Sequence, residues 1–217
     1  MNVISYLFDF VMHIDKHLSL LIGQYGVLVY VMLFLIVFCE TGLVVTPFLP
    51  GDSMIFAAGT FAGIGDLHIA ILFFSLWAAA ILGNIVNYSI GRKIGPKITG
   101  KENPKFIKKE YLDKTHAFYD RYGGLTIIIT RFMPIIRTFA PFVAGLGEMK
   151  YSKFFLFNLI GGTLWVSLFA FGGYFIGNNA FVKAHFTEVI YAILIISLLP
   201  AFIGALKAKF GKTKKAA

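Results

Sequence analysis

Four ionisable side chains lie within apolar stretches of this chain and are its best candidates for chemistry. They are Glu40, Asp52, Arg131 and Arg137. Prolines and a glycine interrupt the same stretches, at Pro47, Pro50, Gly51, Pro134 and Pro141. An ionisable group at bilayer depth costs from about 2.5 kcal/mol upward and is kept mainly where it faces a protein interior or a water-filled cavity. The pairing of these opposite charges is therefore the strongest functional clue in the sequence.

The side-chain types suit phosphate binding and proton exchange. A guanidinium group is a planar, permanently charged donor fork that fits phosphate. Arg131 and Arg137 are six residues apart, about 600° around an unbroken helix, so they converge on one headgroup only if the backbone breaks near Pro134. Burial and a neighbouring arginine act on a carboxylate in opposite directions, which would let Glu40 or Asp52 exchange a proton. The same residues could instead form structural ion pairs that lock two segments together.

Composition indicates an integral membrane protein. The 217 residues are 58% hydrophobic, include 24 Phe and are only 14% charged, whereas soluble domains are about 45–50% apolar. The N-terminus lacks a basic region and a small-residue cleavage site, so no removable signal peptide is expected. Cys39 is the single cysteine, which excludes an intramolecular disulfide.

The net charge of +9 is unevenly placed. Basic residues cluster between Arg92 and Arg121 and again between Lys207 and Lys215. The positive-inside rule places both regions in the cytoplasm, where they would meet anionic phospholipids. The basic clusters flank apolar spans and lack interleaved aromatic residues, so nucleic acid is not an expected partner.

Hydropathy predicts an all-α fold in one membrane domain over residues 1–217. The apolar run 27–39 would make a helix of about 20 Å, too short for a hydrocarbon core of about 30 Å. Short arms around a polar break favour a re-entrant hairpin, which enters and leaves the membrane on one side. The expected segments are an interfacial helix at 1–25, a re-entrant hairpin at 26–66, a transmembrane helix at 69–91, an amphipathic cytoplasmic loop at 92–124, a second re-entrant hairpin at 125–150, transmembrane helices at 154–177 and 188–206, and a basic cytoplasmic tail at 207–217.

This order of segments predicts an inverted repeat. Each half holds a charged, interrupted hairpin followed by a glycine-bearing span, and the hairpins would open to opposite sides of the membrane. Secondary transporters use such repeats to place a site near the membrane midplane. Asn84 and Asn87, in the first span, are expected to form interhelical hydrogen bonds.

Several motifs resemble those of the DedA family of bacterial inner-membrane proteins. They are Phe38-Cys39-Glu40-Thr41-Gly42, Phe48-Leu49-Pro50-Gly51-Asp52-Ser53, Arg131-Phe132-x-Pro134-x-x-Arg137-Thr138 and Pro141-x-x-Ala144-Gly145. The resemblance covers nearly the whole chain and implies a VTT-type fold with two opposed re-entrant hairpins. It also implies transport of a polyprenyl-phosphate carrier lipid, with links to the proton motive force and to envelope integrity. The family's important acids fall on Glu40 and Asp52 and its arginines on Arg131 and Arg137, whereas Asn84 stands where many relatives carry an aspartate.

The resulting hypothesis is a lipid flippase of the bacterial inner membrane that recycles undecaprenyl phosphate. Arg131 and Arg137 would bind the phosphate, while Glu40 and Asp52 would take protons or release the headgroup. Supporting roles are expected for Pro47, Pro50, Gly51, Ser53, Pro134, Thr138, Pro141, Asn84 and Asn87.

Three other functions stay open on the sequence: a proton-coupled cation exchanger, a phospholipid scramblase and a non-transporting envelope scaffold. An envelope scaffold predicts that charge-reversed pairs, such as Glu40→Arg with Arg131→Glu, restore function. No nucleophile–base pair or metal constellation is visible, so neither an enzyme nor a cofactor or metal site is expected. The sequence leaves homo-oligomerisation open.

Overall fold

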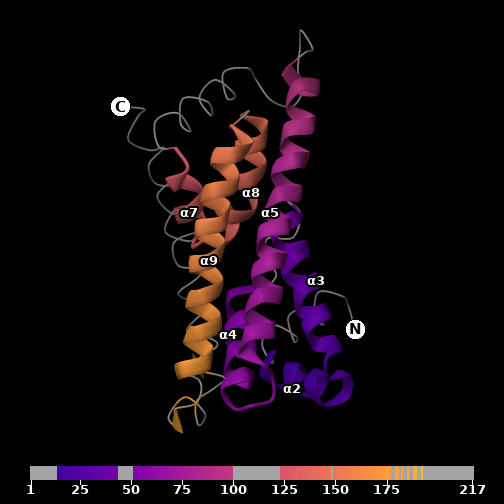
Figure 1. The fold of residues 1–217 in the computed structure, drawn as a ribbon, viewed down its shortest axis with the longest axis vertical. Coiled ribbons are helices and arrows are strands. Elements are labelled where there is room, and N and C mark those ends of the chain that lie inside the picture. Colours follow the sequence, from indigo (N-terminus) through magenta and orange to yellow (C-terminus); the bar gives the residue numbers. More distant parts are fainter. Residues whose placement is uncertain are drawn as a thin grey trace, which may run out of the picture.

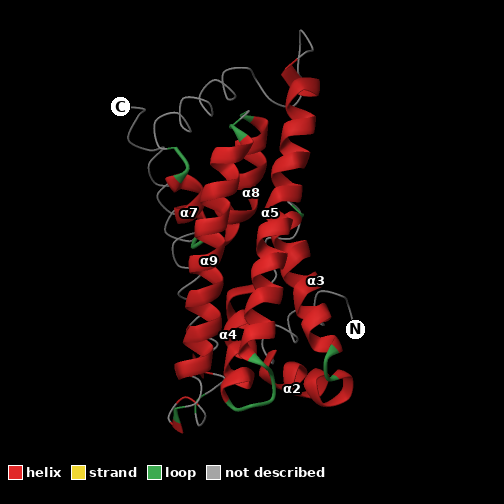
Figure 2. Cartoon of the chain, viewed as in Figure 1, coloured by secondary structure: helices red, strands yellow, loops and turns green. Residues whose placement is uncertain are grey.

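The computed structural model describes residues 14–43, 51–99, 123–147 and 149–176, together with a few positions between 179 and 192. All regular elements of these residues are helices (Figure 2), which confirms the predicted all-α class. The helices are α2 (Ile14–Tyr25), α3 (Leu28–Gly42), α4 (Gly51–Gly63), α5 (Ile69–Thr99), α7 (Leu125–Thr130), α8 (Pro134–Leu146) and α9 (Tyr151–Ile176). Pro47, Pro50, most of the expected loop 92–124, the tail 207–217 and nearly all of the expected span 188–206 lie outside the described residues.

Two helices are long and apolar enough to cross a membrane. They are α5, over Ile69–Gly95, and α9, over Tyr151–Ile176. At 1.5 Å per residue each is about 40 Å long, more than the hydrocarbon core of about 30 Å. Both run along the long axis of the molecule and contact each other (Figure 1). Helix α5 continues past the expected end at residue 91 as far as Thr99, and Gly95 still packs against Leu146 of α8.

Four of the shorter helices occur in two pairs, α3 with α4 and α7 with α8. Helix α7 ends at Thr130, and the backbone is extended at Met133 before α8 begins. Pro134 is the first residue of α8, a position where its fixed φ fits the helix and its missing N–H costs nothing. The predicted break of the backbone near Pro134 is thus confirmed.

Each pair packs against both long helices in the same pattern. The first helix of a pair lies on the long helix that follows it in the sequence, so α3 packs on α5 and α7 on α9. The second helix crosses to the other long helix, so α4 packs on α9 and α8 on α5. The segments α4 and α9, far apart in sequence, lie side by side in Figure 1.

Glycines let the backbones meet at these two crossings, α4 with α9 and α5 with α8. A Cβ on any of four glycines would overlap a carbonyl oxygen of the facing helix. The pairs of glycine and carbonyl are Gly59 with Ala170, Gly173 with Phe56, Gly91 with Phe142 and Gly145 with Tyr88. In every pair the carbonyl belongs to the residue three positions before the facing glycine. The two crossings are therefore built alike, by the small-residue contact that membrane helices use for close packing.

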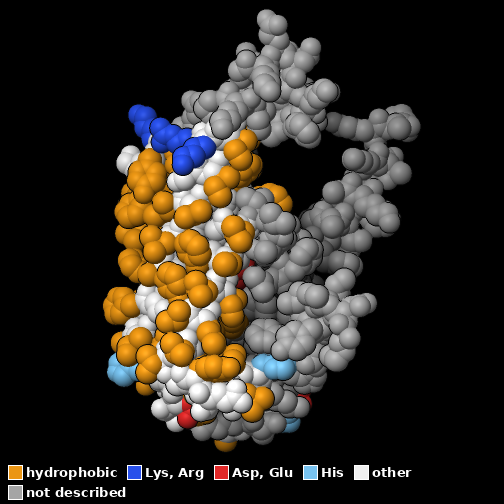
Figure 3. Space-filling view, turned by 90° about the vertical axis from the view of Figure 1, so that its right-hand side faces the viewer, with side chains coloured by type: hydrophobic (Ala, Val, Ile, Leu, Met, Phe, Trp, Pro, Cys, Tyr) orange, Lys and Arg blue, Asp and Glu red, His pale blue; other side chains and the backbone are white. Residues whose placement is uncertain are grey.

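The outer surface of the long helices is apolar. Large hydrophobic side chains such as Phe74 on α5 and Phe175 on α9 are more than half exposed. Figure 3 shows hydrophobic side chains covering much of one face, with Lys and Arg side chains at one end and His side chains at the other. Such a belt is what a lipid-facing surface requires, and it leaves the polar groups between the helices.

Candidate functional site

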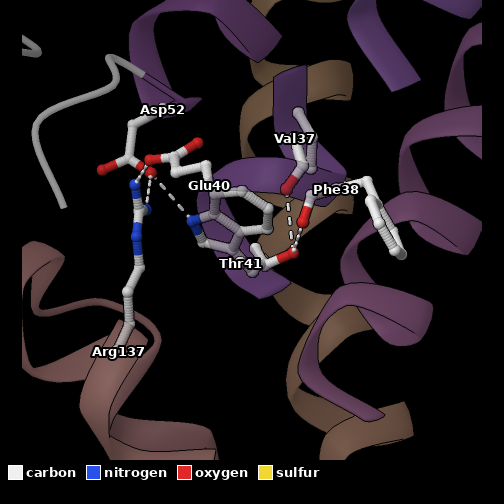
Figure 4. A network of polar contacts seen from close by, with 7 residues as sticks. Val37, Phe38, Glu40, Thr41, Asp52 and Arg137 are labelled. Atoms are coloured by element: carbon white, nitrogen blue, oxygen red, sulfur yellow. Dashed lines mark hydrogen bonds and ion pairs between the residues drawn. The ribbon is translucent and has the colours of Figure 1, made fainter. Parts of the chain in front are cut away.

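Arg137 joins two carboxylates from the other half of the chain. It lies in the first turn of α8, and its Nη1 donates to Oδ1 of Asp52 at 2.5 Å while its Nη2 donates to Oε1 of Glu40. All three residues are at most 7% exposed. Figure 4 shows the guanidinium group pointing toward both carboxylates. One fixed positive charge thus faces two acids, as a forked donor can.

The local sequence explains how the acids reach this point. Glu40 lies near the end of α3, where the hydroxyl of Thr41 turns back to the carbonyl of Val37 at 2.8 Å (Figure 4). Asp52 is in the first turn of α4, where the positive end of the helix dipole favours a carboxylate. Gly51 lies directly against Glu40, and a Cβ at this position would overlap Oε2 of the glutamate. A larger residue at position 51 would push Glu40 away from Arg137.

Arg131 is held differently. Its Nη2 donates to Oδ1 of Asn158 at 2.5 Å and to the carbonyl of Ala80 at 3.4 Å, and the residue is only 4% exposed. Among the described residues no carboxylate pairs with it. Gly161 and Gly162 on α9 make room for its side chain, because a Cβ on either would lie 3.2 to 3.3 Å from it. Neutral amide and carbonyl oxygens therefore surround a permanent charge.

Two asparagines of α5 form interhelical hydrogen bonds, as predicted. The Nδ2 of Asn87 donates to the carbonyls of Thr41 at 3.1 Å and Thr138 at 2.7 Å, which links the end of α3 to the first turn of α8. The Nδ2 of Asn84 donates to Oδ1 of Asn158 at 3.0 Å. Asn84 thus supports the acceptor of Arg131.

Trp165 on α9 contacts both arginines. Its Nε1 donates to Oδ1 of Asp52 at 2.9 Å. The centroid of its ring lies 5.1 Å from Cζ of Arg137 and 6.0 Å from Cζ of Arg131. Trp165 is not among the candidate residues that the sequence pointed to. The available signal was its polar N–H, which needs an acceptor when the indole is buried.

Five buried polar atoms around the cluster have no hydrogen-bond partner within the described residues. They are Oε2 of Glu40, Oγ of Ser53, Oδ1 of Asn87 and the Nε atoms of Arg131 and Arg137. Buried polar atoms are nearly always paired with protein or water. A group of unpaired donors and acceptors in one place is typical of a site that receives water or a polar ligand.

The structure therefore brings together most of the predicted site residues. Glu40, Asp52 and Arg137 form one unit, and Arg131 lies beside it across Trp165. The predicted supporting residues Gly51, Ser53, Asn84, Asn87 and Thr138 are buried at or next to the cluster, and Pro134 and Pro141 belong to α8. Pro47 and Pro50 lie outside the described residues.

Known proteins resemble this chain over most of its length. The model of the VTT domain matches residues 49–175. Protein DedA of Escherichia coli K12 is 50% identical over 96% of both chains. An uncharacterized membrane protein of Mycobacterium leprae is 44% identical over 78% of this chain and 76% of its own, and the inner membrane protein YghB of Escherichia coli K12 is 33% identical over 86% and 85%. No solved structure matches.

Proposed function

This chain belongs to the DedA family of VTT-domain membrane proteins, and we propose that it carries a polyprenyl-phosphate lipid, such as undecaprenyl phosphate, across the bacterial inner membrane. The observation that carries the proposal is the state of Arg131. This buried guanidinium has only neutral acceptors among the described residues and an unpaired Nε. A phosphate oxygen at Nε would supply the anionic partner that the arginine lacks.

The apolar surface supports the proposal that the phosphate belongs to a lipid. The outer faces of α5 and α9 carry exposed large hydrophobic side chains, so a prenyl tail can stay in the bilayer while its headgroup enters between the helices. A free polar anion would have to cross the same apolar surface without such a tail. The proposed substrate thus matches both the charge inside and the lipid-facing surface outside.

The charge balance supports a link between phosphate and protons. Two arginines and two ionised carboxylates sum to zero, so an incoming phosphate would add negative charge to a buried site. Uptake of a proton by Glu40 or Asp52 would offset that charge. By linkage, proton binding then favours phosphate binding and the reverse.

The same proposal includes an inverted repeat of re-entrant hairpins. Helices α3 and α4 have 15 and 13 residues, or about 20 Å each, which is short of a full crossing. The matching glycine crossings of α4 with α9 and of α8 with α5 support a repeat. We place the end rich in Lys and Arg, and the C-terminus, in the cytoplasm, and α2 with the preceding residues at the membrane interface.

The test is translocation of undecaprenyl phosphate in liposomes that contain the purified protein, with and without a pH gradient. Arg131→Gln should abolish the movement in a protein that still folds. Arg92→Gln is the matched control, because Arg92 lies on α5 outside the cluster and contacts Tyr88. Movement at the wild-type rate in Arg131→Gln would refute the proposal.

One observation favours a scaffold as the second candidate function. Nη1 and Nη2 of Arg137 each bind an acid of the other half, which is what a structural lock between the halves would show. The swap Glu40→Arg with Arg137→Glu tests this, since Arg137 is the partner that the structure gives to Glu40. Restored envelope function without lipid movement would establish the scaffold.

A further inference from the structure

Trp165 has the polar contacts of a positioning residue. It is 1% exposed, its N–H is bound to Asp52, and both arginines lie within 6.0 Å of its ring centroid. It comes from α9, whereas Asp52 comes from α4 and the arginines from α8 and the end of α7. Trp165 thus contacts three of the four charges of the cluster.

Both arginines of the cluster lie near Trp165, but Asp52 pairs with Arg137. Both guanidinium groups lie near the ring whose N–H holds Asp52, yet the hydrogen bond of the carboxylate goes to Arg137. Oδ1 of Asp52 accepts from Trp165 and from Arg137 together. The indole N–H therefore fixes the orientation of the carboxylate toward Arg137.

From this geometry we infer that Trp165 assigns Asp52 to Arg137 and so keeps Arg131 available for the phosphate group of the substrate. Without the indole N–H, Asp52 can turn toward Arg131 and compete with the incoming anion. The identity of that anion rests on the proposed function. The role of Trp165 as the residue that directs Asp52 rests on the contacts alone.

The chain supplies a matched control in Trp77, its only other tryptophan. The Nε1 of Trp77 on α5 donates to Oγ1 of Thr163 on α9 at 2.9 Å. Trp77→Phe and Trp165→Phe therefore each remove one indole hydrogen bond at α9 and keep an aromatic ring. They differ in whether the lost bond belongs to the charge cluster.

The first measurement is the rate of undecaprenyl phosphate translocation as a function of lipid concentration. Trp165→Phe should raise the half-saturating concentration about tenfold, the usual effect of losing a hydrogen bond to a charged group, with little change in the maximal rate. Trp77→Phe should leave both values unchanged. Equal half-saturating concentrations in the two variants would overturn the inference while leaving the proposed function intact.

The second measurement keeps Trp165 in place and needs no lipid. In Trp77→Phe protein labelled with ¹⁵N-tryptophan, the single indole N–H resonance reports on the acceptor of Trp165. Asp52→Asn should shift this resonance, because an amide oxygen is a weaker acceptor than a carboxylate, and the exposed Asp66→Asn should not. An unmoved resonance in Asp52→Asn would overturn the inference. If Asp52→Asn shifts the resonance but the wild-type protein moves no lipid, the proposed function is refuted. The link from Trp165 to anion affinity is then refuted with it.

Discussion

Removing the charge of Arg137 should destabilise the protein far more than removing that of Arg131. Arg137→Gln leaves Glu40 and Asp52, which are 0% and 7% exposed, without the cation that binds both. Breaking a buried ion pair by removing one partner costs about 3–5 kcal/mol, because the other charge stays buried and uncompensated. Two carboxylates lose their partner here, so the loss should lie at or above the upper end of this range.

Arg131→Gln has a different expected balance. The variant loses the hydrogen bonds from a charged donor to Asn158 and Ala80. Each such bond contributes at most about 3 kcal/mol to the free energy of unfolding. It also removes a buried charge that has no carboxylate partner in the described part of the chain, and burial of such a charge costs several kcal/mol. Because a glutamine amide can still donate to Asn158, the free energy of unfolding should fall by no more than about 1 kcal/mol.

The assay is reversible unfolding of each purified variant in mixed micelles, followed by circular dichroism as the fraction of denaturing detergent rises. Arg92→Gln serves as the control for the loss of an arginine outside the cluster. We expect Arg137→Gln to be less stable than Arg131→Gln by at least about 3 kcal/mol. Equal losses in the two variants would show that Arg131 also serves an ion pair, and the reasoning that reserves it for a ligand would be refuted.

Three further variants test the packing around the site by the same unfolding assay. Gly173→Val should lose about 1–3 kcal/mol because its side chain overlaps the backbone of α4, whereas Gly172→Val, which has only ordinary contacts, should change little. Asn87→Leu should lose about 1–3 kcal/mol because two buried backbone carbonyls lose their donor. Tyr88→Phe should lose about 1 kcal/mol, since the tyrosine hydroxyl donates to the buried carbonyl of Met149.

Hydropathy predicted the long helices because apolar length is a local property. The expected spans 69–91 and 154–177 correspond to α5 and α9. The end of α5 was missed because the charged residues after Gly91 are typical of a loop. In the structure the helix runs on to Thr99, and Gly95 packs against α8. The sequence also shows that the spans carry glycines, but which helix each glycine faces depends on contacts between distant segments.

The charged residues of the site were predictable because an ionisable side chain within an apolar stretch is costly to bury, whichever partner it has. Their partners were not. The charge-reversed pair expected from the sequence joined Glu40 to Arg131, whereas the structure joins Glu40 to Arg137, across 97 positions of the chain. The acceptor of the Trp165 N–H lies 113 positions away. The identity of these pairs depends on the register of α4 and α8 against the long helices, which the four charges alone do not fix.

The division of charges between the halves has a consequence for the proposed transport. The acids come from the α3–α4 pair and the arginines from the α7–α8 pair, so any movement that separates the pairs must break the contacts of Arg137 with Glu40 and Asp52. An empty and fully ionised site would resist such movement, because separation leaves buried charges unpaired. Protonation of an acid weakens one side of this lock, and a phosphate on Arg131 stabilises the protonated state through the charge balance. On the proposed function, the contacts that hold the site closed are therefore also the ones that limit movement to states in which proton and phosphate are both present.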